Sequence, residues 1–116
     1  MMGIAQVRGD VYRTLAAAPL DVDTVLGFEP RELPPGITLT VSTGGQNASA
    51  WYIVLRVYVS GNLPPGPSQE RLDNVLDTTL DYLPGYGPDD WTVEWDPDLG
   101  VLIGACQLEV PRAFED

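Results

Sequence analysis

The chain has 116 residues, of which 17 are acidic and 6 basic, so its formal net charge is −11 and its isoelectric point lies near 4.1. This length predicts a single domain over residues 1–116, and the 44% hydrophobic and 20% charged residues are typical of a globular protein rather than a disordered acidic tail. Because affinity for nucleic acid depends on neutralising phosphates with Lys and Arg, the charge argues against a protein that binds DNA or RNA.

Two residue types that carry much of enzyme chemistry are missing, since the chain contains neither His nor Lys. Without His there is no imidazole base for the usual hydrolase triad and no His-containing zinc site. Without Lys there is no Schiff base and no P-loop lysine, so the glycines of STGGQNAS (residues 42–49) are not expected to hold a nucleotide phosphate. We therefore expect no catalytic residue, no bound metal and no cofactor.

The cysteine content and the apolar segments indicate the compartment. The one cysteine, Cys106, lies in the apolar run VLIGACQLEV and can form no internal disulfide, so we expect a buried structural thiol. The first residues, MMGIAQVRGD, lack the apolar centre of a signal peptide, and no segment reaches the ~18 apolar residues of a membrane span. These features predict a soluble protein made in a reducing cytoplasm.

Helical periodicity begins the chain, and it predicts an amphipathic helix over residues 3–18 that ends at Pro19. The apolar residues that recur at helical spacing are Ile4, Val7, Val11, Leu15 and Ala18. The following segment, up to the pair Pro34-Pro35, mixes isolated apolar residues with Gly and Pro, which indicates an irregular connection. We expect Val25, Leu26 and Phe28 to hold this connection against the core.

Two segments then alternate with the period of a half-buried strand: ITLTV (residues 37–41) and WYIVLRVYVS (residues 51–60). The polar loop STGGQNASA between them predicts an antiparallel hairpin with an extended tip. One face of the second strand carries amphipathic side chains that would meet solvent or another subunit. The candidate interface residues in this region are Gly44, Gly45, Gln46 and Asn47 at the tip and Tyr52, Arg56 and Tyr58 on that face.

A second helix is predicted from Ser68, a suitable N-cap, to Leu83, before Pro84-Gly85. Its leucines gather on one stripe. Asp73, Asp77 and Asp81 recur at every fourth position and lie about 100° or more from the centre of that stripe. The helix is therefore the main packing helix, with a row of carboxylates beside its buried face.

The last third of the chain predicts two more strands, WTVEW (residues 91–95) and VLIGACQLEV continuing toward Pro111, joined by the turn DPDLG. Trp91, Val93 and Trp95 alternate with polar residues and are expected to supply core. The order helix, two strands, helix, two strands predicts an α+β fold: an antiparallel four-stranded sheet packed by two helices, with element order α-β-β-α-β-β.

The aspartate row allows several interpretations. Mg²⁺ or Ca²⁺ needs oxygen ligands that converge from several directions, whereas a straight helical row converges poorly. Acid and base catalysis by paired carboxylates needs two groups across a cleft, one with a raised pKa. A solvated face or a protein contact fits the pattern better. For the acidic residues of the loops, such as Asp89, Asp90, Asp96 and Asp98, turn formation and capping are the simplest roles.

Four segments carry a family resemblance that spans nearly the whole chain but includes no catalytic motif. They are the helix IAQVRGDVYRTLAA, the segment LPPGITLTV leading into the first strand, the strand WYIVLRVYV, and the helix RLDNVLDTTLDYL followed by two final strands. Together they resemble the tail terminator (tail completion) proteins of long-tailed bacteriophages, especially phages that infect high-GC actinobacteria.

The resemblance implies a structural protein of the virion, not an enzyme. Such a subunit would assemble as a ring, typically hexameric, at the head-proximal end of the tail tube, where it would stop tube polymerisation and join the tail to the neck. Its partners would be other copies of itself, the major tail tube protein and the neck or head completion proteins, with no membrane involved. It would be assembled in the host cytoplasm and reside at the tail-neck junction.

In such a ring, DNA would pass through without specific binding, because a channel lined with carboxylates repels phosphates. The aspartate row would then face the channel or solvent, or pair with an arginine of a neighbour: Arg8, Arg13, Arg56 or Arg71. Two alternatives remain from the sequence: a head completion or connector subunit of the neck, and an acidic small-molecule hydrolase.

Overall fold

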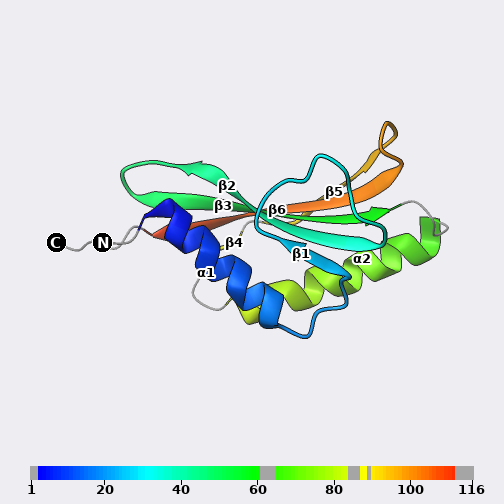
Figure 1. The fold of residues 1–116 in the computed structure, drawn as a ribbon, viewed down its shortest axis with the longest axis horizontal. Coiled ribbons are helices and arrows are strands. Elements are labelled where there is room, and N and C mark those ends of the chain that lie inside the picture. The colour runs from blue at the N-terminus through cyan, green and yellow to red at the C-terminus, as the bar shows by residue number, and fades with distance from the viewer. Residues whose placement is uncertain (1–2, 61–64, 84–86, 89, 112–116) are drawn as a thin grey trace.

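A computed structural model describes residues 3–60, 65–83, 87–88 and 90–111 (Figure 1). The described helices are α1 (Ile4–Ala17), α2 (Pro65–Thr79) and the short 3₁₀ helix η1 (Leu80–Tyr82). The described strands are β1 (Thr24–Leu26), β2 (Ile37–Gln46), β3 (Ala50–Ser60), β4 (Gly87–Pro88), β5 (Thr92–Asp96) and β6 (Val101–Pro111). The α+β class predicted from the sequence is thus what the structure has.

The sheet itself differs from the prediction of four antiparallel strands. It is mixed, with the order β1-β2-β3-β6-β4, and β5 pairs with β6 on the same side as β4. Strand β1 runs parallel to β2, whereas the other pairs are antiparallel. The prediction of an antiparallel four-stranded sheet with element order α-β-β-α-β-β is therefore wrong.

The physical reason for the first error lies in the connection between β1 and β2. Parallel neighbours need a crossover of roughly a dozen residues, and residues 27–36 form such a crossover by passing over the face of the sheet opposite the helices (Figure 1). Strand β1 is too short to alternate visibly, and the Gly and Pro residues after it suggested an irregular segment. Phe28, expected to hold this segment against the core, is 59% exposed.

The second error is β4, which lies in a segment with the composition of a turn. Pro88 fits here because its missing N–H is tolerated on an edge strand.

Both helices cover one face of the sheet and bury a single core against it (Figure 1). Alternate residues of β3, such as Ile53, Leu55 and Val57, are fully buried on this face. They stand opposite Leu108, Cys106 and Gly104 of β6, respectively. Cys106 is 3% exposed, which confirms the prediction of a buried thiol. From α1 the core receives Val7, Val11 and Leu15, and from α2 it receives Leu72, Val75 and Leu76.

Helix α1 lies close to its predicted span, and its last residue precedes Ala18, which is extended because Pro19 follows it. Helix α2 begins earlier than predicted. Ser68, expected as its N-cap, is 5% exposed and lies inside the helix, which starts at Pro65. Proline is tolerated in the first turn because the first N–H groups of a helix have no intrahelical partner.

The predicted core role of the alternating aromatic segment is only partly correct. Trp91 is half-buried and packs against the core. Val93 and Trp95 are 41% and 56% exposed. They lie on the outermost strand, one strand beyond Gly104, the position that Leu72 and Leu76 of α2 cover.

A junction of backbone and side-chain hydrogen bonds fixes the start of β2. Asp23 donates its backbone N–H to the carbonyl of Ile37 (2.9 Å) and accepts from the Ile37 N–H through Oδ2 (2.8 Å). Gly36, which directly precedes Ile37, donates its N–H to Ser60 Oγ (3.1 Å), and its carbonyl accepts from the Ser60 N–H (3.1 Å). Its φ of +88° and the Asp23 carboxylate leave no room for a Cβ atom.

Candidate functional site

The face of the sheet opposite the helices carries a cluster of side-chain hydrogen bonds that joins the crossover to β2 and β3. The crossover of residues 27–36 covers part of this face, so Thr38 and Thr40 are fully buried beneath it. The remaining part carries half-buried side chains of β3 and β6, including Tyr52, Val54 and Ile103. We call it the open face.

Glu29 of the crossover is the centre of a hydrogen-bond cluster on the open face. Tyr58 donates its hydroxyl to Glu29 Oε1 (2.6 Å), and Thr40 donates to Oε2 (2.7 Å). Arg56 also reaches Oε2 (3.3 Å). These three partners come from alternating positions of β2 and β3, where Thr40 stands opposite Arg56. The cluster fastens the crossover to the sheet.

The cluster changes the acidity of two of its members. Partial burial raises the pKa of Glu29. Hydrogen bonds from Tyr58 and Thr40 and the charge of Arg56 together lower it by more than burial raises it, so its net pKa is below the ordinary 4.5. Burial first, and then the hydrogen bond and charge of Glu29, raise the pKa of Tyr58. At neutral pH the tyrosine hydroxyl is therefore a protonated donor and Glu29 an ionised acceptor.

Replacing Glu29 with glutamine is expected to reduce the free energy of unfolding by about 1 kcal/mol at neutral pH, because the carboxylate is partly exposed. Since its folded pKa lies below its unfolded value, the unfolded chain binds more protons near pH 4, and stability rises with pH there. The advantage of wild type over Glu29→Gln should be complete above pH 4.5 and disappear as pH falls through the folded pKa.

Urea denaturation of both proteins between about pH 3 and pH 7 checks this expectation. Glu32→Gln is the matched control, since it removes the same charge from the same crossover and no described residue hydrogen-bonds to Glu32. An equal loss of stability for both variants at every pH would contradict the role given to Glu29.

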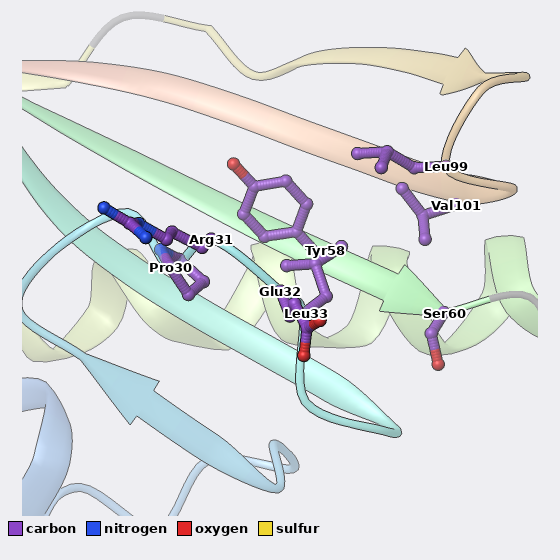
Figure 2. Close-up of a pocket in the computed structure, with 8 residues that line it drawn as sticks. All are labelled: Pro30, Arg31, Glu32, Leu33, Tyr58, Ser60, Leu99 and Val101. Carbon is purple, nitrogen blue, oxygen red and sulfur yellow. The ribbon is translucent and has the colours of Figure 1, made fainter.

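Two hollows flank this cluster. The larger, about 400 Å³, lies between Pro30, Arg31 and Leu33 of the crossover on one side and Leu99 and Val101 on the other. Figure 2 shows the ring of Tyr58 standing between these two walls. The smaller, about 290 Å³, lies along β6 and is lined in part by Arg56, Asp90 and Gln107. Thr92 and Cys106 also line the smaller hollow, but Cys106 is only 3% exposed.

The hairpin tip is a second candidate surface, and a single asparagine orders it. Asn47 accepts hydrogen bonds through Oδ1 from the N–H groups of Ser49 (2.8 Å) and Ala50 (2.9 Å). Its Nδ2 donates to the Tyr52 hydroxyl (3.0 Å). The hairpin was predicted correctly, but β2 continues to Gln46, so its tip is shorter than the nine-residue loop expected.

The tip residues predicted for an interface are thus gathered in one place. Gln46 and Asn47 are exposed, and Gly44 and Gly45 precede them at a register shift between β2 and β3. A Cβ atom at Gly44 would lie 2.8 Å from Val54 Cγ2, so the bulge needs glycine there. Tyr52 joins this group through Asn47, whereas Arg56 and Tyr58 belong to the Glu29 cluster.

The aspartate row lies on the helix side of the sheet, away from both of these groups. Asp73, Asp77 and Asp81 are all exposed, and Asp73 accepts a hydrogen bond from Gln69 Nε2 (2.9 Å). The four arginines that were predicted as candidate partners of this row in a neighbouring subunit each contact a residue of their own chain. Arg8 donates to Thr43, Arg13 pairs with Asp10, Arg56 with Glu29 and Arg71 with Asp21.

Among the described residues, no group of three or more Cys, Asp or Glu side chains could hold a metal ion. Within the same part of the chain, no helix is long and apolar enough to cross a membrane.

Glu29 is the residue that the sequence did not reveal. It lies in a connection without periodicity, and nothing nearby in the chain marks it. The available signal was indirect: Thr40, Arg56 and Tyr58 share one face of a predicted hairpin, and an Arg on a partly covered face needs a carboxylate.

The chain matches no protein-family model, and no curated protein is significantly similar to it.

Proposed function

We propose that this protein is a structural subunit of a phage tail that forms a ring at the head-proximal end of the tail tube, as tail terminator proteins do. The ring would stop tube polymerisation and join the tail to the neck proteins. The sequence resemblance suggests this function, and the surface of the described residues is suited to binding without catalysis.

The observation that carries the proposal is the β2–β3 hairpin. Its exposed tip is held in one conformation by Asn47 and contains no reactive group. A rigid, polar tip of this kind can contact another protein with little loss of conformational entropy. The chain is also elongated, with extents of 52 × 26 × 22 Å, and the turn between β2 and β3 lies at one end of its long axis (Figure 1).

The acidic hydrolase is the weaker alternative. An acid catalyst of the glycosidase kind needs a carboxyl group with a raised pKa. Glu29, the carboxylate whose environment is best defined in the described chain, has a lowered pKa and its hydrogen bonds are structural.

Purified protein is expected to bind one end of preformed tail tubes and to form a closed ring there, visible by electron microscopy and by the mass of the capped particles. Asn47→Ala should reduce capping by about tenfold, since loosening the tip raises the entropy cost of contact. Asn74→Ala is the control, because Asn74 is exposed on α2, far along the chain from the tip.

Two further results decide between the versions of this proposal. Protein that stays monomeric and leaves both tube ends free would contradict it. Replacing Asp73, Asp77 and Asp81 together by Asn should impair ring assembly only if the row lies between subunits; unchanged ring mass and capping would remove the row from the interface.

A further inference from the structure

Strand β5 forms an open edge of the sheet. It pairs with β6 on one side, and no described strand pairs with it on the other. A strand in this position presents a row of unpaired backbone N–H and C=O groups, which can form a ladder with a strand from another chain. Natural edges are often protected by Lys or Pro, and Thr92–Asp96 contains neither.

The side chains of β5 add apolar surface to this edge. Val93 and Trp95 point to the helix side of the sheet, as their partners Gly104 and Leu102 show, yet they are 41% and 56% exposed. An exposed Trp beside an open strand edge is a typical anchor for a protein contact.

The charge of the region selects the partner. Glu94 and Asp96 alternate with the apolar residues on β5, and Asp90 and Asp98 lie at its two ends. No Arg or Lys occurs anywhere between Arg71 and Arg112. A segment that binds this edge would therefore gain from basic side chains beside the carboxylates.

A second copy of this chain is a poor occupant of the edge, because like charges directly opposite destabilise a strand pair. A two-fold antiparallel pairing centred on Glu94 would set that residue opposite itself, one centred on Val93 would set Asp90 opposite Asp96, and one centred on Trp95 would set Glu94 opposite Asp96. The occupant must bring the opposite charge.

We propose that β5 accepts an extended segment of another protein as an added strand, and that Lys or Arg alternates with apolar residues in this segment. The apolar side chains would lie beside Val93 and Trp95, and the basic ones beside Glu94 and Asp96. This inference does not depend on the proposed role in a phage tail.

A synthetic ten-residue peptide that alternates lysine and valine tests the proposal by titration calorimetry and by amide chemical shifts of the ¹⁵N-labelled protein. Binding should shift the amides of residues 92–96. Two versions, N-methylated either on every lysine or on every valine, separate a strand ladder from simple charge attraction. In a strand ladder, either the lysines or the valines point their N–H groups at β5, and the other residues point theirs away. Methylation of the residues that face β5 should weaken binding about tenfold, whereas methylation of the others should leave it nearly as strong as for the parent.

Two variants locate the site. Glu94→Lys and Trp95→Ala, both at exposed positions, should each weaken peptide binding by about tenfold. Asp77→Lys is the matched control, since it makes the same change of charge on the exposed side of α2 and should alter the affinity less than about threefold. The proposal is overturned if the parent peptide does not bind at millimolar concentration, if both methylated peptides bind alike, or if Asp77→Lys weakens binding as much as Glu94→Lys.

Discussion

Replacing Gly36 with alanine is expected to lower the free energy of unfolding by about 2–4 kcal/mol, from backbone strain at positive φ and disruption of a partly buried hydrogen-bond junction. The new Cβ would lie 2.1 Å from Asp23 Oδ2, so the carboxylate must leave the N–H of Ile37. Chemical denaturation monitored by tryptophan fluorescence measures this loss.

Gly100→Ala is the control for strain alone, because Gly100 also has a positive φ (+66°) but a Cβ atom there would meet nothing within 4 Å. It should cost only about 1 kcal/mol. Introducing Gly36→Ala into an Asp23→Ala background should cost less than in wild type, since the clash is then absent. If Gly36→Ala and Gly100→Ala cost the same in wild type, the Asp23 junction contributes nothing.

Truncation of Leu55 to alanine is expected to destabilise the domain by about 3 kcal/mol, within the usual range for a buried leucine. Leu55 is fully buried between Val41 and Cys106 on the helix face. Little rearrangement can fill the cavity there, because both neighbours belong to long strands of the sheet. The midpoint and slope of a urea unfolding curve give the change.

Val54→Ala is the matched control, since Val54 is the next residue of the same strand and is half-buried on the open face. Its loss should cost less than about 1 kcal/mol. Similar costs for the two variants would mean that the open face is as well packed as the helix face, contrary to the one-sided core described above.

The elements in which the hydrophobic pattern continues over many residues could be predicted from the sequence, for a simple physical reason. In α1 and β3 the side chains that face the core recur at the period of the backbone, so Val7 and Val11, or Ile53 and Leu55, reveal both the element and its buried face. The buried environment of Cys106 followed from the same pattern.

The parts that were missed depend on the tertiary structure. Strand β1 is held by backbone pairing with β2, and a three-residue strand has too few side chains to show a period. Trp95 alternates like a core residue, but the pattern cannot show that helix α2 does not extend over the edge strand. Ser68 was predicted as the N-cap because its side chain suits that position. The helix instead begins three residues earlier, at Pro65, since proline is tolerated in the first turn.

The candidate surfaces were predicted unequally. The hairpin tip was identifiable because Gly, Asn and Gln interrupt two alternating segments, and Tyr52 stands beside it. In the Glu29 cluster, Thr40 and Tyr58 lie 11 and 29 positions after Glu29 in the sequence, and Glu29 itself stands in a segment without any local pattern. The acidic edge at β5 becomes a surface only once its pairing with β6 is known.

The crossover that passes over the open face has a consequence for the motions of the molecule. Apart from the bond of Gly36 to Ser60 Oγ at its C-terminal end, the described side-chain hydrogen bonds between the crossover and the sheet all involve Glu29, whereas the core lies on the other side of the sheet. The crossover can therefore lift without exposing the core, at a free energy well below that of global unfolding. Thr38 and Thr40 would then be reached by solvent while the helices stay in place, so the two faces of one sheet would open on different timescales.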